Sequence, residues 1–335
     1  MVRCPLCNNF ERKPRDYRVA FDLSAQELNT SAAAGCLICS ILHDGVTHFS
    51  PKIGGLTDEH RIYVWGSSVE GGGSIEMEIY ASGTLKMALE FFLASNSASP
   101  IRGMKTLPTI PGDTASEESM AWVRKLLENC AKFHESCSLD EASNIPTRVL
   151  EIGPEEEEPA IKLLCSPNMK ARYACLSHCW GDSRAIVTEK ETLESHMRGV
   201  KWRSLPQTFQ EAILITRRLG LRYLWIDSLC IIQDDVEDWR KESAQMASIY
   251  QNSYITIAAT KSPHDSGGCY STNSIYHKDY RLKLRGRPSD PIYVREKIMH
   301  FGDSRCPTPL LTRAWAYQER LLAPRFVHFC EKEIV

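Results

Sequence analysis

The stretch from Tyr223 to Asp235, YLWIDSLCIIQDD, constrains the fold more than any other part of the chain. Its apolar run, Leu224 to Ile226, is too short for a helix and is typical of a buried strand in a parallel sheet. The run ends at Asp227, and a carboxylate inside a protein is unfavourable unless it has a partner. In open α/β sheets, ligands bind just outside the carboxyl ends of the strands. We therefore expect Asp227 to lie at a ligand-binding edge of a sheet.

Strands and helices alternate around this stretch. Apolar, β-branched runs predict strands at 147–153, 160–166, 174–177, 223–226 and 254–259. Helical periodicity predicts helices at 188–197, 208–219, 236–250 and 312–322. Such alternation implies βαβ crossovers and a mainly parallel sheet with helices on both faces.

The first 140 residues differ in character. Two alternating segments, RIYVWGSS and SIEMEIYAS, flank Glu70 to Gly73 and predict a β-hairpin. Residues 95–119 are rich in Ser, Pro and Thr, which indicates a connector. We expect a Cys-rich N-terminal α+β segment over 1–140 and a separate α/β domain over 141–335.

Two C-x2-C pairs lie in the first forty residues, namely Cys4 with Cys7 and Cys36 with Cys39. Paired thiolates at this spacing chelate Zn²⁺ and close a tetrahedral Cys4 site. The alternative is that Cys36 and Cys39 are small apolar positions of a helix. The 13 cysteines are an odd number, and the start of the chain has no apolar leader. Both features favour reduced thiols, metal ligands or core packing in a cytoplasmic protein over a disulfide framework.

A helix is predicted from Glu117 to Cys137, with Ser116 as its cap. Cys130, His134 and Cys137 share one face of this helix and could hold a metal if a fourth ligand came from elsewhere. The alternative is a packed face with a hydrogen-bonded histidine.

Charge and hydropathy exclude two classes of partner. The net charge of −2 gives no general reason to bind nucleic acid. No apolar run approaches the ~20 residues that cross a bilayer. The chain stops just after a strand-like segment, RFVHFC, so we expect it to be a piece of a longer protein.

Five segments carry a resemblance to a known family. In chain order they are YACLSHCWGD, LPQTFQEAI, LGLRYLWIDSLCIIQDD, DWRKESAQMASIYQNSYITIAA and TRAWAYQERLLAPR. They resemble the successive motifs of the HET domain, which drives heterokaryon incompatibility and regulated cell death in filamentous fungi. Two positions depart from the family pattern: Glu211 stands where Asp is common, and His178 stands where Tyr is common.

HET domains are in turn remotely similar to TIR domains, a flavodoxin-like α/β class of which many members cleave NAD⁺. The catalytic Glu of those enzymes lies in a W-C-x-x-E pattern, and Trp315 to Glu319 has the same spacing without the Cys. The resemblance implies that Glu319 is catalytic and that NAD⁺ is the substrate. Trp239 and Glu242 offer a rival pair at a shorter spacing.

This chemistry suits the residues near the expected strand ends. One ionised carboxylate stabilises the oxocarbenium-like transition state of N-ribosyl cleavage. An aromatic such as Trp180 or Trp315 can stack on a ring of the substrate, Asp182 and Asp227 can hold ribose hydroxyls, and Arg313 can face the pyrophosphate. The predicted substrate-binding set is Ser177, Trp180, Gly181, Asp182, Asp227, Arg313 and Trp315.

Each assignment has a structural alternative. Glu319 can be a solvent-facing residue or an ion-pair partner of Arg320 or Arg325, and Asp227 can be a helix cap. Trp180 and Trp225 can belong to the core.

Two other functions remain open. Cys179 or Cys230 could be a nucleophile beside His178 or His196. The second of these functions is that of a non-catalytic death-signalling module that acts by self-assembly. For the TIR-like enzyme and for the signalling module alike, the resemblance implies self-association, with an upstream sensor or an NLR-type protein as a further partner.

Overall fold

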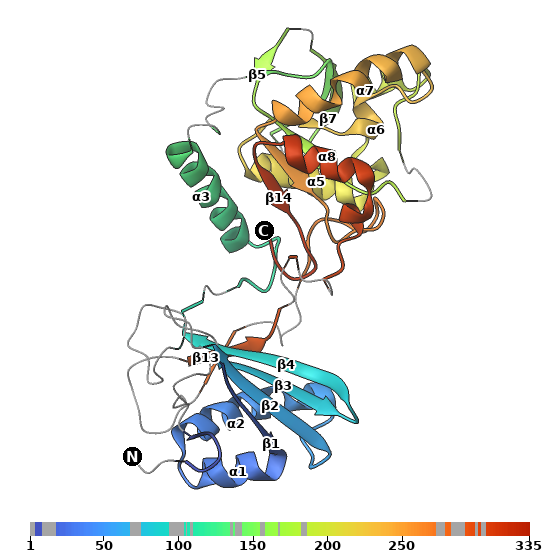
Figure 1. Cartoon of the computed structure of the whole chain (residues 1–335). Coiled ribbons are helices and arrows are strands. Elements are labelled where there is room, and N and C mark those ends of the chain that lie inside the picture. The colour runs from blue at the N-terminus through green and yellow to red at the C-terminus, as the bar shows by residue number, and fades with distance from the viewer. Residues whose placement is uncertain are drawn as a thin grey trace. The chain divides into compact units, whose positions relative to one another are not determined.

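The chain forms two compact units in the computed structural model (Figure 1). The N-terminal unit comprises residues 1–112 and 273–298, and the C-terminal unit comprises 113–272 and 299–335. The division falls before the predicted helix at Glu117 rather than at residue 140, and the later segment 273–298 returns to the first unit. The described residues are 4–8, 18–67, 75–93, 104, 106–107, 110–134, 137, 143–154, 158–166, 168–181, 186–272, 279–282, 292–298, 301–302 and 306–335.

The N-terminal unit is built on an antiparallel sheet in the order β1-β2-β3-β4-β13-β12. Its strands are β1 (Arg18–Ser24), β2 (His60–Ser67), β3 (Ile75–Ala81), β4 (Thr84–Leu93), β12 (Tyr280–Arg281) and β13 (Ile292–Glu296). The predicted pairing of β2 with β3 is confirmed, although the turn residues Glu70 to Gly73 lie outside the described residues.

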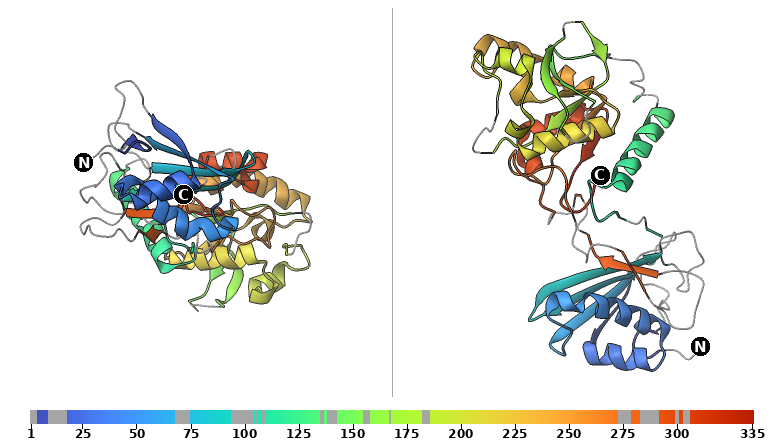
Figure 2. Two further views of the ribbon diagram at one scale, coloured as in Figure 1. Left: turned by 90° about the horizontal axis from the view of Figure 1, so that it is seen from below. Right: turned by 180° about the vertical axis from the view of Figure 1, so that it is seen from behind.

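Two helices, α1 (Ala25–Ala33) and α2 (Leu37–Phe49), cover one face of this sheet (Figures 1 and 2). Alternate residues of the strands, such as Ile62 and Met77, point into the core shared with α2. Gly45 lets α2 approach closely, because a Cβ there would lie 2.5 Å from the ring of Phe91. A short 3-10 turn, η2 (Ser50–Ile53), ends α2.

The C-terminal unit contains a mixed sheet in the order β14-β11-β9-β10-β6-β7. Strands β9 (Tyr173–Ser177), β10 (Tyr223–Trp225), β11 (Ile255–Ala258) and β14 (Phe326–His328) are mutually parallel. Strands β6 (Arg148–Ile152) and β7 (Ile161–Cys165) join antiparallel at the β10 edge. The expectation of a mainly parallel sheet is therefore met only by those four strands, because β6 and β7 form a hairpin rather than a βαβ crossover. A two-stranded ribbon joins β5 (Ser143–Asn144) to β8 (Lys170–Ala171).

Helices lie on both faces of this sheet, with α5 and α8 on opposite sides (Figure 2). The helical elements are α3 (Glu117–Phe133), α4 (Leu193–Arg198), η4 (Trp202–Ser204), α5 (Gln207–Arg218), α6 (Asp227–Cys230), α7 (Val236–Gln251), η6 (Pro309–Thr312) and α8 (Ala314–Leu322). The core between the layers is centred on the predicted strand, where Leu224, Trp225 and Ile226 are fully buried.

Two predicted helices differ from the observed ones at their ends. Helix α4 begins at Leu193 rather than Thr188, because the backbone at Thr188 forms a β-bridge with Ile232. Helix α3 is capped by Ser116 as predicted but ends at Phe133, four residues before Cys137. In the described part of the chain, no helix has the length and apolar character that would let it cross a bilayer.

Candidate functional site

The carboxyl ends of the parallel strands bring the predicted site residues together. Ser177 ends β9 and pairs with Ala258 at the end of β11, while Asp227 follows β10 after one residue. Parallel strands end at the same edge of a sheet, so these positions are neighbours although they are distant in sequence. The expected placement of Asp227 at this edge is observed.

Glu319 reaches this edge from α8. Its side chain is buried, with 6% exposure, and the Ser177 hydroxyl donates a hydrogen bond to its Oε2. Burial, with a smaller contribution from the nearby negative charge of Asp227, raises the pKa of Glu319 to about 7. The alternative of a solvent-facing Glu319 is therefore wrong. Within the described residues, no ion pair joins Glu319 to Arg320 or Arg325.

Two further groups affect the pKa of this carboxyl group. The charge of Arg313 and a hydrogen bond with the Tyr250 hydroxyl both lower the pKa of Glu319, against the larger effect of burial. Arg313 is held in place because its guanidinium donates to the backbone carbonyl of His178. The site thus combines a carboxyl group that titrates near neutral pH with a fixed positive charge.

Asp227 is fixed by two donors. Trp180 Nε1 donates to its Oδ2 at 2.9 Å, and the backbone N–H of Ser228 donates to its Oδ1 at 2.7 Å. Asp227 is the first residue of α6, whose N-cap is Ile226 and which has no side-chain cap hydrogen bond, so the alternative of Asp227 as a helix cap is wrong. Trp180 is half-buried and stacks on His178, with ring centroids 6.4 Å apart.

Gly181 has a backbone role next to this pair. Its φ is +74°, and a Cβ there would lie 2.6 Å from Cβ of His264. The loop after β9 therefore needs glycine for both its conformation and its packing. Asp182, the next residue of the predicted set, lies outside the described residues.

Trp315 does not join the buried site. Its side chain is 59% exposed, while Glu319 one turn later is buried. Trp315 was predicted to stack on a ring of the substrate. Helix α8 packs on the sheet through Ala316 and Glu319, which leaves Trp315 outside the buried group of side chains.

The thiol and imidazole groups near the strand ends do not form a nucleophile pair. Burial raises the pKa of Cys179, and it raises the pKa of Cys230 to about 12, so both remain protonated. Burial, with the charge of Arg313, lowers the pKa of His178 to about 3. These environments argue against the cysteine-nucleophile alternative.

The rival acidic residue, Glu242, is also buried, with 1% exposure. Neither of its carboxylate oxygens has a hydrogen-bond partner among the described residues. Its charge stabilises the guanidinium of Arg148, which forms an ion pair with Asp238. We interpret Glu242 as part of a buried charge cluster, and Trp239, its supposed partner in the shorter motif, is 52% exposed.

A cavity of about 710 Å³ lies at the opposite edge of the same sheet. It is lined by residues that precede β10 and follow β6, including Arg222 and Pro154. Its cations already have partners, since Arg222 and Lys162 contact Glu151 and Arg217 donates to the Pro154 carbonyl. We assign no ligand to this cavity.

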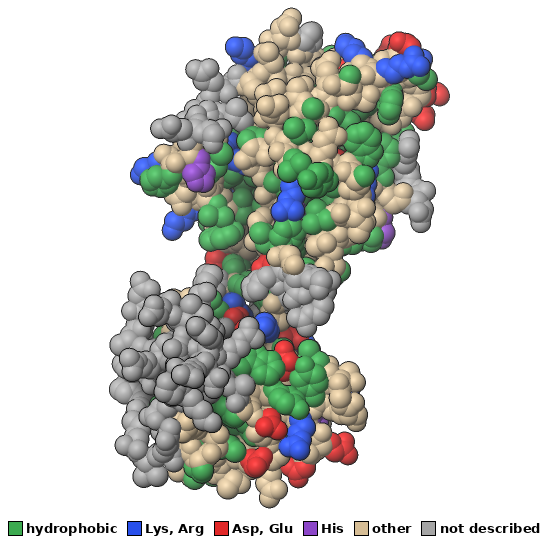
Figure 3. Space-filling view, viewed as in Figure 1, with side chains coloured by type: hydrophobic (Ala, Val, Ile, Leu, Met, Phe, Trp, Pro, Cys, Tyr) green, Lys and Arg blue, Asp and Glu red, His purple; other side chains and the backbone are tan. Residues whose placement is uncertain are grey.

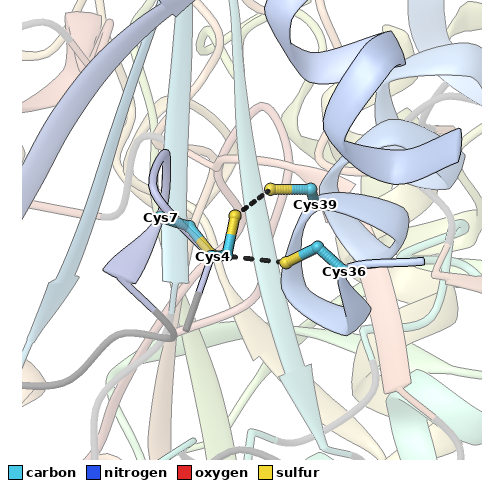
Figure 4. Close-up of side chains that lie close together, drawn as sticks. All are labelled: Cys4, Cys7, Cys36 and Cys39. Atoms are coloured by element: carbon cyan, nitrogen blue, oxygen red, sulfur yellow. Dashed lines mark hydrogen bonds between the residues drawn. The ribbon is translucent and has the colours of Figure 1, made fainter. Parts of the chain in front are cut away.

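The N-terminal unit contains a second candidate site, formed by the two C-x2-C pairs (Figure 4). The four Sγ atoms lie within 4.8 Å of one another, with 4.0 Å between those of Cys4 and Cys39 and 3.5 Å between those of Cys7 and Cys36. Four sulfurs at about 2.3 Å from a tetrahedral zinc ion would be about 3.8 Å apart. The cluster can therefore hold a metal ion.

The local structure prepares these thiols for metal binding. Cys36 caps α2 and Cys39 lies in its first turn, while Cys4 and Cys7 lie in a turn closed by the Asn8 N–H and the Cys4 carbonyl. A hydrogen bond from Cys7 is the main cause that lowers the pKa of Cys39 to about 6.

Sequence patterns missed two residues of these sites. Tyr250 ends the helix predicted at 236–250, and no pattern indicated that it is 2% exposed and contacts Glu319. Ser31 lies 3.2 Å from Cys4 Sγ. Neither residue belongs to a spacing motif. For Tyr250 the only available signal is that a buried tyrosine hydroxyl needs a hydrogen-bond partner.

Comparison with known proteins supports the assignment of the C-terminal unit. The family model of the heterokaryon incompatibility protein (HET) matches residues 173–319, from the first residue of β9 to Glu319. The chain has no match among the curated proteins and none among the solved structures. The match covers the strand ends that carry Ser177 and Asp227 and confirms the resemblance found in the five motifs. Residues 173–319 of the C-terminal unit therefore carry a heterokaryon incompatibility (HET) domain.

Proposed function

We propose that the C-terminal unit is a TIR-like enzyme of regulated cell death that cleaves NAD⁺ at its nicotinamide-ribose bond. The observation that carries the proposal is the buried Glu319 carboxyl group at the carboxyl edge of four parallel strands, with a pKa raised to about 7 by burial. A group that titrates near the working pH at a ligand-binding edge is typical of active sites. The order of the parallel strands is compatible with the flavodoxin-like class to which TIR domains belong.

In this reaction the bond between the nicotinamide nitrogen and ribose C1′ breaks. The electron pair leaves with nicotinamide, which becomes a neutral ring, and positive charge develops on the ribose. Ionised Glu319 stabilises that charge, and water then adds to C1′ and releases a proton. The products are nicotinamide and ADP-ribose, and no general acid is needed.

The remaining residues of the edge have distinct roles in this proposal. Ser177 orients Glu319 through its hydrogen bond, and Arg313 supplies the positive charge that suits the pyrophosphate. Asp227 accepts from Trp180, so the carboxylate and the indole can together position a ribose and a ring. The exposed Trp315 takes no part inside the site.

The test is nicotinamide release by the purified full chain, fused to an oligomerising scaffold and incubated with NAD⁺. Glu319→Gln preserves the shape of the side chain and removes its charge. Turnover should fall at least ~100-fold, because loss of one preorganised electrostatic interaction costs about 3 kcal/mol or more.

Glu194→Gln is the matched control, because that side chain is 86% exposed on α4. It should keep full turnover. Asp227→Asn should also lower turnover while the melting temperature hardly changes. Near-full turnover of Glu319→Gln, or a clustered parent chain that never consumes NAD⁺, would refute the enzyme proposal.

A second candidate function is signalling by self-assembly, and one observation favours it. Helix α8 exposes Trp315, Tyr317 and Leu321, which are 59%, 68% and 66% exposed. Hydrophobic side chains also gather on the face of the C-terminal unit shown in Figure 3. Exposed apolar groups of this size mark interaction surfaces.

The double variant Tyr317→Ser with Leu321→Ser separates the two candidates. If assembly is the function, the variant should lose both assembly, measured by light scattering, and cell killing. If NAD⁺ cleavage is the function, a variant forced to cluster by the fused scaffold should still release nicotinamide.

For the N-terminal unit we propose that Cys4, Cys7, Cys36 and Cys39 bind one structural Zn²⁺. A closed set of four thiolates is the usual ligand set of a structural zinc ion, whose role is to stabilise the fold. Elemental analysis of protein purified without chelators should find this zinc, and its absence would refute the assignment.

A further inference from the structure

The end of α3 carries a second group of metal-ligating side chains, in the C-terminal unit. The ligand atoms of Cys130, His134 and Cys137 all lie within 4.8 Å of one another. This group is separate from the NAD⁺ site and from the four-cysteine cluster of the N-terminal unit.

A continuous helix does not produce this convergence. Helix α3 ends at Phe133, and His134 adopts an extended conformation with φ −113° and ψ 100°. The chain then turns back, and the backbone N–H of Cys137 donates to the carbonyl of His134 at 3.0 Å. The turn returns the third side chain to the first two after the helix has stopped.

Contacts from another part of the chain hold this turn. The guanidinium of Arg325, a buried residue, donates to the backbone carbonyl of Cys137 and also to that of Tyr254, the latter at 3.2 Å. The same guanidinium lies 4.7 Å from the ring of Tyr254. Cys137 Sγ is 4.0 Å from the carbonyl of Pro324. The position of Cys137 is thus set by the segment that leads into β14.

We propose that Cys130, His134 and Cys137 form a Zn²⁺ site of the open type. Two thiolates and one imidazole suit zinc, whereas Mg²⁺ and Ca²⁺ require oxygen ligands. Three protein ligands leave one of four tetrahedral positions for water. The two thiolate charges balance the charge of the ion, and exposed His134 gives the ion a route from solvent.

The two metal sites then differ in kind. The four-cysteine cluster is largely buried and closed, whereas this site has half-buried thiols and an exposed imidazole. The open site would fasten the end of α3 to the Pro324 segment of the same unit.

Zinc content per chain tests the proposal in the full-length protein, purified without chelators. The parent should contain two zinc ions, and Cys137→Ser and Cys130→Ser should each contain one. Cys165→Ser is the matched control, because Cys165 is an exposed thiol of the same unit outside the group, and it should contain two.

His134→Ala keeps the test decisive if the cysteine variants misfold, because the exposed imidazole can be removed without disturbing the core. The affinity of the His134→Ala variant for one of the two zinc ions should fall at least about 100-fold, as measured by competition with a chromophoric chelator. Mutation of a residue that only hydrogen-bonds to a zinc ligand already lowers metal affinity about 10- to 100-fold. A zinc content that does not fall in Cys130→Ser and Cys137→Ser, or unchanged affinity in His134→Ala, would overturn the proposal without bearing on the four-cysteine site or on NAD⁺ cleavage.

Discussion

The two units each contain a six-stranded sheet, but only one of the sheets has convergent strand ends. The sheet of the N-terminal unit is antiparallel, so neighbouring strands end at opposite edges and its metal-ligating side chains lie beside the sheet, in a turn and at the start of α2. In the C-terminal unit, four parallel strands end at one edge, where Ser177, Asp227 and Glu319 meet. Strand direction thus decides where each unit can place polar chemistry.

The units also bury acidic side chains in different ways. Glu90 in the N-terminal unit is 7% exposed and accepts two hydrogen bonds from Arg295, which is 2% exposed and lies 4.5 Å from the Phe92 ring. Glu319 is equally buried, yet a hydroxyl rather than a cation donates to it. A paired charge supports the fold, whereas a carboxyl group held without an ion pair keeps a raised pKa and is available for chemistry.

Metal removal should produce the largest difference in stability between the two units. Cys39→Ser, or a chelator, should unfold the N-terminal unit, because a structural zinc ion contributes on the order of 10 kcal/mol to folding. Hydrogen exchange should rise throughout β1 to β4 and stay unchanged in the core strands β9 to β11. Unchanged exchange in the N-terminal unit after chelation would contradict a structural role for zinc.

Core truncations should show whether each sheet supports its own unit. Leu224→Ala in β10 and Leu89→Ala in β4 remove fully buried side chains, so each should lower the stability of its own unit by about 2 to 5 kcal/mol. Denaturant unfolding followed by exchange in each unit measures the effect. If Leu224→Ala loosened both units equally, the division into two independently stabilised parts would be wrong.

The pH dependence of stability should mark Glu319 as a destabilising charge. Its folded pKa is about 7 against an ordinary value of 4.5, so the unfolded chain ionises first as pH rises. Stability is lost between pH 4.5 and 7, and the full cost of about 3 kcal/mol is present above pH 7. Glu319→Gln should therefore match the parent at pH 4 and be more stable than the parent at pH 8, as measured by denaturant unfolding.

The same titration should appear in catalysis, with activity rising through pH 7 as Glu319 ionises. A parent and variant with equal stability at both pH values would show that the carboxyl group is not held at a raised pKa. Glu194→Gln, on the exposed face of α4, should show no such pH dependence.

Removal of the Ser177 hydroxyl should have the smallest effect. The hydrogen bond from Ser177 lowers the pKa of Glu319, so Ser177→Ala should raise that pKa further. A hydrogen bond to a charged group is worth about 1.5 kcal/mol, which is roughly one pKa unit. The midpoint of the pH-activity profile should move upward by that amount, and a downward shift would exclude the proposed orientation of the bond.

The sequence by itself determined the local elements and the ligand patterns. Apolar runs and their periodicity predicted β9, β10, β11, α5 and α7, because these signals depend on neighbouring residues. The abrupt end of an apolar run placed Asp227 at a strand end, and the spacing of Cys4, Cys7, Cys36 and Cys39 predicted a cluster that the fold brings together.

Only the tertiary structure decided the environment of each side chain. The hydrogen bond between Ser177 and Glu319 spans 142 positions, so no local pattern could reveal that Glu319 is buried and Trp315 exposed. The antiparallel β6 and β7, and the return of β12 and β13 to the first sheet, likewise depend on which strands pair at long range. Burial and pairing between distant segments set charge and pKa, and these are the properties on which the proposed chemistry rests.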